Sequence, residues 1–137
     1  MKKLFLFCFL ALMAVCISAQ TLQKGNLVGV HLISMTLNAG VTEDQVMDFV
    51  LNKYIPAYEK LFPGVHVYLA KGIRGENADR YYQFVVMEND EVRNKIFNAE
   101  GTYTDEASAK LANIQPLLDE YHKMATITSV YTDCIVQ

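Results

Sequence analysis

The sequence has no tryptophan, three prolines and three cysteines in 137 residues. Cys8 and Cys16 lie in an N-terminal apolar stretch, and Cys134 is the one cysteine beyond it. If that stretch is removed, no intramolecular disulfide forms, and buried apolar surface must supply the stability. Because Cys134 fits an alternating C-terminal strand, we expect it to be a packed or half-exposed strand residue rather than a reactive thiol.

Motifs for metals, phosphates and nucleotides are also missing. The sequence contains no HxH, HExxH or CxxC spacing, so no metal site is predicted. It has no dinucleotide fingerprint or nucleophile elbow, and the short stretch 72–75 (GIRG) is too small for a phosphate loop. We therefore predict no cofactor. Haem needs one axial histidine in an apolar pocket, which three scattered histidines permit but do not indicate.

Positive charge is not in excess. The chain has 12 basic and 15 acidic side chains. Lys2 and Lys3 fall in the first 19 residues, so the rest carries 10 basic against 15 acidic groups, a formal charge of −5. This balance does not suggest a nucleic-acid partner.

The N-terminus has the layout of a signal peptide. Two lysines precede an apolar run over residues 4–17, and the small pair Ser18 and Ala19 follows. The run is shorter than the roughly 20 residues that span a bilayer. We therefore predict a signal peptide at 1–19.

What remains, residues 20–137, has the size of one domain. We expect it to be exported to the periplasm or secreted, with no stable membrane insertion after signal removal. Cys16 offers a rival interpretation as a lipidation site, but Val15 before it does not suit a lipoprotein.

Apolar periodicity predicts the order strand, helix, strand, strand, helix, strand. The long helices begin after Thr42, which has Gln45 at capping-box spacing, and after Thr104. Pro56 and Pro116 fall inside these helices, and we expect a kink near residues 52–56 and an interruption of the second helix. The strands are expected at 27–37, 65–71, 80–88 and 125–136, and a short helix at 89–97.

Right-handed crossovers then give an α+β, ferredoxin-like βαββαβ sandwich, a four-stranded antiparallel sheet with both helices on one face. If Val65, Val67 and Leu69 meet the helices, His66 and Tyr68 point the other way. Further apolar and aromatic side chains are available for this second face, namely His31, Ile33, Met35, Ile127 and Tyr131. An open face of this kind predicts a partner.

Four features carry a family resemblance: the stretch 29–33 (GVHLI), the capped first helix, the junction 62–65 (FPGV) and the stretch 82–86 (YQFVV). In these features the chain resembles the dimeric α/β-barrel superfamily, and most closely its small stress-responsive type. The resemblance covers nearly all of 20–137, and the junction is its more specific part.

The resemblance implies a homodimer in which two sheets close into a barrel. Members of the superfamily include cofactor-free monooxygenases, haem-handling enzymes and isomerases, and many use a cleft between the sheet and the helices, so the fold does not settle the function. The stress-responsive type has a histidine-rich stretch after its third strand. Residues 93–99 here contain no histidine, so a site built on that stretch is absent or replaced.

The candidate catalytic residues are His66 and His31, because histidine is the side chain that most commonly serves as an acid or base at physiological pH. They would share a site if their strands were neighbours. Tyr68, Tyr81 and Tyr131 are the candidate ligand-binding residues and could form hydrogen bonds in that site. The alternative is that both histidines pack in the sheet. We interpret His122 as a surface residue at a helix end, and the charged run at 88–93 as the solvent face of the short helix.

Three hypotheses follow. The first is a homodimer that binds a small apolar or aromatic molecule in the sheet-helix cleft. The second is an enzyme of the cofactor-free monooxygenase or isomerase kind, with His66 or His31 as base. The third is a non-catalytic structural subunit of an envelope complex.

Overall fold

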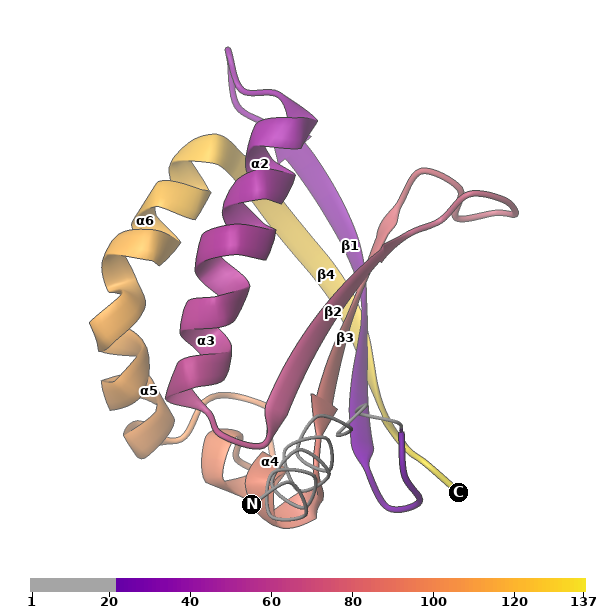
Figure 1. Cartoon of the computed structure of the whole chain (residues 1–137), viewed down its shortest axis with the longest axis vertical. Helices are drawn as coiled ribbons and strands as arrows, with labels where there is room; N and C mark the ends of the chain where they lie inside the picture. The colour runs from indigo at the N-terminus through magenta and orange to yellow at the C-terminus, as the bar shows by residue number, and fades with distance from the viewer. Residues whose placement is uncertain (1–21) are drawn as a thin grey trace, which may run out of the picture.

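The computed structural model describes residues 22–137, and the predicted signal peptide with Cys8 and Cys16 lies outside this part. A four-stranded sheet of order β2-β3-β1-β4, antiparallel throughout, carries the long helices on one face (Figure 1). The strands are β1 (Leu27–Leu37), β2 (Val65–Lys71), β3 (Tyr81–Met87) and β4 (Ala125–Ile135). The helices are α2 (Glu43–Phe49), α3 (Ile55–Leu61), α4 (Asp90–Ile96), α5 (Asp105–Leu111) and α6 (Gln115–Met124).

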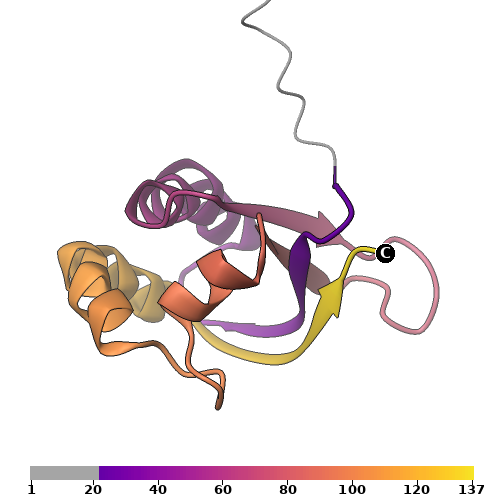
Figure 2. The ribbon, with the colours of Figure 1, turned by 90° about the horizontal axis from the view of Figure 1, so that it is seen from below.

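This arrangement confirms the predicted ferredoxin-like fold. Strands β1 and β2 have the predicted bounds, and β3 and β4 are shorter than predicted by two residues and one. The sheet curves, and α4 lies at one end of the layer between the sheet and the long helices (Figure 2). No helix among residues 22–137 is long and apolar enough to cross a membrane.

The first long helix changes its hydrogen-bonding pattern before Pro56. Thr42 and Gln45 form the predicted capping box, and the turn at Val50–Tyr54 between α2 and α3 is π-helical. Proline has no N–H and crowds the carbonyl four residues earlier, and one wider turn relieves both constraints. At the position of the expected kink the structure has a π-helical turn, which ends two residues before Pro56.

The second long helix is interrupted in a different way. Thr104 caps α5 through the N–H of Ala107, and a 3-10 turn over Ala112–Ile114 separates α5 from α6. Pro116 lies in the first turn of α6, where its missing N–H would have no helical partner in any case.

The core lies between the helices and one face of the sheet. Val46 of α2 and Val65 of β2 are its largest fully buried side chains. The strand register also places on this face five residues that we had assigned to the opposite face, namely His31, Ile33, Met35, Ile127 and Tyr131. Ile33, Met35 and Ile127 lie toward the core, and His31 and Tyr131 line a hollow with Arg93 of α4. The suggestion that they belong to the open face with His66 is wrong. The apolar residues of β1 occur on both faces, so the sequence pattern did not fix its orientation.

The opposite face of the sheet is open and largely apolar, as predicted. We call it the open face; its central side chains are Val28, Val30, Leu32, Tyr68, Tyr82, Phe84, Val86 and Val130. Val130 is 72% exposed and Tyr68 46% exposed. Cys134 also lies on this face in β4 and is exposed.

Candidate functional site

A row of polar side chains crosses the helix-facing side of the sheet. His31 is the direct partner of Gln83 on β3 and of Tyr131 on β4. In the next row toward the start of β1, Val67, Val85 and Gly29 are apolar, and Asp133 on β4 is the polar member. Because the helix-covered face of such a sheet normally carries apolar residues, three polar groups in one row mark a site.

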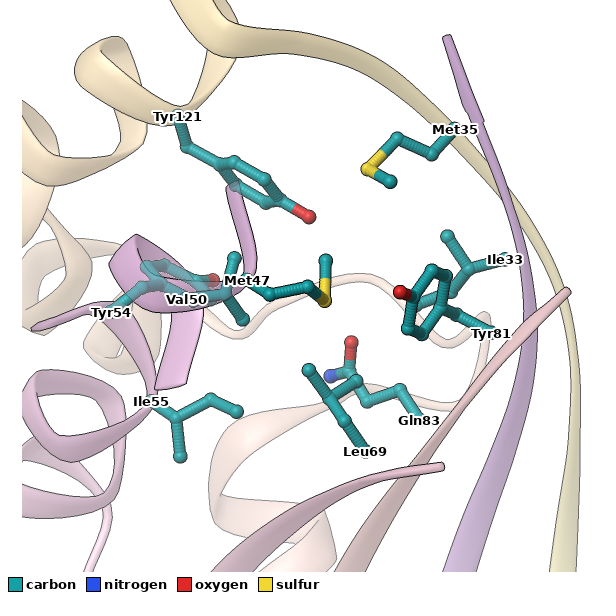
Figure 3. Close-up of a pocket in the computed structure, with 10 residues that line it drawn as sticks. All are labelled: Ile33, Met35, Met47, Val50, Tyr54, Ile55, Leu69, Tyr81, Gln83 and Tyr121. Atoms are coloured by element: carbon teal, nitrogen blue, oxygen red, sulfur yellow. The ribbon is translucent and has the colours of Figure 1, made fainter. Parts of the chain in front are cut away.

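On one side of this row lies an apolar pocket between the sheet and the helices (Figure 3). Met47 extends into its centre, with Tyr121, Tyr81 and Gln83 around it. The free space is about 20 Å³, about enough for one water molecule. The residues that line this pocket, here called the apolar pocket, are Ile33, Met35, Met47, Val50, Tyr54, Ile55, Leu69, Tyr81, Gln83 and Tyr121.

Burial keeps the two helix tyrosines of the apolar pocket protonated. The rings of Tyr54 and Tyr121 lie 5.7 Å apart. Desolvation raises the pKa of Tyr54 strongly and that of Tyr121 to a lesser degree, both from the ordinary value of a phenol. Both side chains therefore remain neutral hydroxyl groups over the physiological pH range.

A third tyrosine of the pocket is tied to the start of α2. The Tyr81 hydroxyl donates to the carboxylate of Glu43, which also accepts from Lys71 Nζ at 2.6 Å. The hydrogen bond from Lys71 is the main cause that lowers the pKa of Glu43, followed by that from Tyr81. Burial, more than Glu43, raises the pKa of Tyr81. These contacts join α2 to β2 and β3 beside the pocket.

On the other side of the row lies a more polar hollow of about 70 Å³. His31 stacks on Tyr131 with ring centroids 5.3 Å apart and an interplanar angle of 22°. Burial lowers the pKa of His31, an effect that the carboxylate of Asp133 opposes. The imidazole is therefore neutral near pH 7. The residues that line this hollow, here called the His31 hollow, are Gly29, His31, Val85, Met87, Arg93, Phe97, Gly101, Tyr131 and Asp133.

Arg93 organises the wall of the His31 hollow. Its Nη2 lies 3.5 Å from Asp133 Oδ2, and its Nη1 donates to the carbonyls of Phe97 at 3.3 Å and Asn98 at 2.7 Å. The Arg93 side chain is only 16% exposed. Its assignment to the solvent face of the short helix is therefore wrong, because the loop after α4 turns back over the sheet and covers it.

The other predicted site residues lie elsewhere. His66 and Tyr68 are on the open face, and the Nδ1 atom of His66 lies 4.0 Å from Glu59 Oε1. The strands of His31 and His66 are not neighbours, since β3 lies between them, so a shared histidine site is excluded. His122 is in the last turn of α6 and exposed, as predicted.

Among the predicted residues, Tyr81 therefore lines the apolar pocket, and His31 and Tyr131 line the His31 hollow. The sequence interpretation missed Gln83 and Asp133. Both are polar residues on strand faces that are otherwise apolar, and this was the available signal. Residues 22–137 contain no group of three or more histidine, cysteine, aspartate or glutamate side chains that could hold a metal ion.

No protein-family model matches the chain, and no curated protein is similar to it. Eight chains of known structure are similar. One, from Bacteroides thetaiotaomicron, is named as an antibiotic biosynthesis monooxygenase; it shares 12% identity over 80% of this chain and 88% of its own, with a TM-score of 0.44. Another is a VAO-type flavoprotein from Myceliophthora thermophila, with 18% identity over 82% of this chain and a TM-score of 0.38, and this chain spans only 19% of it.

Both TM-scores are below 0.5. The fold is assigned from the element order and the strand order β2-β3-β1-β4. In fold, the chain is of the ferredoxin-like type from which dimeric α/β barrels are built, as the resemblance implied.

Proposed function

We propose that the chain is an exported homodimeric protein that binds a small apolar or aromatic molecule between its sheet and its helices. The observation that carries this proposal is the apolar pocket, which combines aliphatic walls with a few converging polar groups, the composition of small-molecule sites. Gln83 at the edge of the pocket and the Tyr54 and Tyr121 hydroxyls supply those polar groups.

Entry of a ligand requires the pocket to widen from its present 20 Å³. Met35 and Met47 can provide the space, because a methionine side chain is unbranched, has three rotatable bonds and adapts to irregular volumes. Met47 occupies the centre of the pocket (Figure 3), so its rotation away from Tyr81 would open space there.

The open face supports the homodimer. An apolar area that extends over all four strands marks an interaction surface. Two copies that pack these faces together would bury Val130, which is 72% exposed in one chain. Native mass spectrometry of the purified protein tests this proposal: twice the chain mass supports it, and a monomer at micromolar concentration contradicts it.

Ligand binding is tested with 1,4-dimethylbenzene as an apolar probe and with carbon-13 labelled methionine methyl groups as the readout. We expect the methyl signals of Met35 and Met47 to shift on titration. Met124, at the end of α6, is not among the residues that line the apolar pocket, so it is the internal control and should not shift. Shifts of equal size at all methionines, or none at Met35 and Met47, would contradict binding in this pocket.

His31 favours a second candidate function, an enzyme of the monooxygenase or isomerase kind. Its imidazole is half-buried, lines the His31 hollow and is neutral near pH 7 because burial lowers its pKa. A neutral imidazole in a cavity can accept a proton from a substrate within hydrogen-bond reach. His66, on the open face, has no place in this mechanism. Loss of turnover in His31→Gln with retained probe binding would distinguish the enzyme from a binding protein.

A further inference from the structure

Two polar atoms converge over Gly29 in the His31 hollow. A Cβ atom at position 29 would lie 3.4 Å from His31 Nε2 and 3.4 Å from Asp133 Oδ1. Gly29 is buried near the start of β1, where a β-branched residue would normally pack better. The missing side chain leaves a polar space with an imidazole nitrogen and a carboxylate oxygen at its border.

The walls of this space are already fixed. The loop at 98–104 is closed by hydrogen bonds between Asn98 and Thr102 through both backbone and side chains. At the start of this loop, Arg93 donates to the carbonyls of Phe97 and Asn98. Gly101 of this loop packs against the Tyr131 hydroxyl, which a side chain at position 101 would displace. A hollow with such walls does not need to reorganise when a ligand group enters.

We propose that the His31 hollow is the polar subsite of the cleft and binds one hydroxyl group of an otherwise apolar ligand, held over Gly29 by His31 and Asp133. This inference rests on the proposed ligand binding in the apolar pocket. It adds the functional group that the ligand carries and the residues that recognise it.

A hydroxyl group fits these two partners better than other groups. It can donate to Asp133 Oδ1 and at the same time accept from the Nε2–H group of a neutral His31 imidazole. In the other neutral tautomer, it can instead donate to His31 Nε2. A carboxylate would face the charge of Asp133, and an ammonium group would face the guanidinium of Arg93, which lies 3.5 Å from the same carboxylate. Since Arg93 and Asp133 neutralise each other, the subsite favours an uncharged ligand group.

The size and the position of the His31 hollow also suit a single hydroxyl group of a ligand. Its free volume of about 70 Å³ accommodates a group of a few heavy atoms. The cross-strand pair His31 and Gln83 separates it from the apolar pocket. A molecule whose ring lies beside Gln83 can therefore direct its hydroxyl toward Gly29.

The test compares 4-methylphenol with 1,4-dimethylbenzene, two probes of similar shape that differ in one hydroxyl. Their affinities are measured with the purified protein at pH 7.5 by the methionine methyl signals. We expect 4-methylphenol to bind about tenfold more tightly, the value of one good buried hydrogen bond, and 4-methylbenzoate to bind more weakly than either.

Two variants locate the subsite. In Gly29→Ala the new methyl group occupies the space over residue 29 with tolerable contacts of 3.4 Å or more, and in Asp133→Asn the acceptor charge is lost. Both variants should lose most of the preference for 4-methylphenol and retain the affinity for 1,4-dimethylbenzene. Glu76→Gln, which removes an exposed carboxylate from the link between β2 and β3, is the matched control and should behave as the unmodified protein.

The outcomes separate the two proposals. If both probes bind equally in the unmodified protein, or if Gly29→Ala keeps the full preference, the hydroxyl subsite is wrong while ligand binding in the apolar pocket stands. If neither probe binds, the proposed function itself is wrong, and the subsite falls with it.

Discussion

His31 and Gln83 face each other across β1 and β3, and this pair forms the boundary between the apolar pocket and the His31 hollow. Opposite residues of an antiparallel pair lie about 5 Å apart at their Cβ atoms, so a group bound at one side chain contacts the other. The chemistry of the cleft therefore depends on two polar residues that a stable core would not need.

Replacement of Gln83 by leucine tests whether the polar row that contains His31 and Gln83 lowers the free energy of unfolding of the protein. Gln83 is only partly exposed and has apolar neighbours in the pocket. We expect Gln83→Leu to raise the free energy of unfolding by about 1 kcal/mol, because a buried leucine gains transfer free energy that an amide does not. Urea denaturation measures the change.

The control for this variant is Gln115→Leu on α6, where the glutamine is exposed and donates to Asp119. It should give no gain. A loss of more than 1 kcal/mol in Gln83→Leu would show instead that the amide of Gln83 makes a hydrogen bond on which the fold depends.

The neutral state of His31 predicts a pH dependence of stability. Burial lowers the pKa of His31 in the folded chain below the value of about 6.5 that it has when unfolded. Between these two values the unfolded chain binds more protons, so the free energy of unfolding decreases as the pH falls below about 6.5. We expect His31→Gln to lose less stability than the unmodified protein between pH 7 and pH 5.

Urea denaturation at several pH values, together with proton NMR titration of the histidine rings, provides the measurement. His122→Gln is the control, because His122 is exposed and does not line the His31 hollow. Parallel profiles for the unmodified protein and His31→Gln would rule out a depressed pKa at His31.

Pro56 permits a prediction about the π-helical turn. In a straight helix an internal proline costs about 3 kcal/mol. Here the turn at Val50–Tyr54 already accommodates the missing N–H of Pro56, so Pro56→Ala should change the free energy of unfolding by less than about 1 kcal/mol. A gain near 3 kcal/mol would mean that the turn relieves none of the strain.

The secondary structure was predictable because its signals are local. The capping box at Thr42 and Gln45, the proline positions and the alternation of β2 all lie within a few residues of the feature that they determine. The sequence did not predict which faces of β1 and β4 meet the helices, since β1 is apolar on both sides. The position of His31 follows from its pairing with Gln83 and Tyr131. The burial of Arg93 could not be predicted either, because it depends on a loop and on Asp133, which is 40 residues away in the sequence.

The open face gives the last prediction. Val130 lies near the middle of β4 on this face and is 72% exposed, so Val130→Lys should leave the fold of one chain intact. In a dimer that buries the open face, the same change places an unpaired ammonium group in an apolar interface, which costs several kcal/mol. We therefore expect Val130→Lys to be a folded monomer by native mass spectrometry and circular dichroism.

Leu51→Lys is the control, because Leu51 is 50% exposed on the helix side of the molecule and its replacement should not affect assembly. A dimer that persists in Val130→Lys but dissociates in Leu51→Lys would place the interface on the helices and not on the sheet.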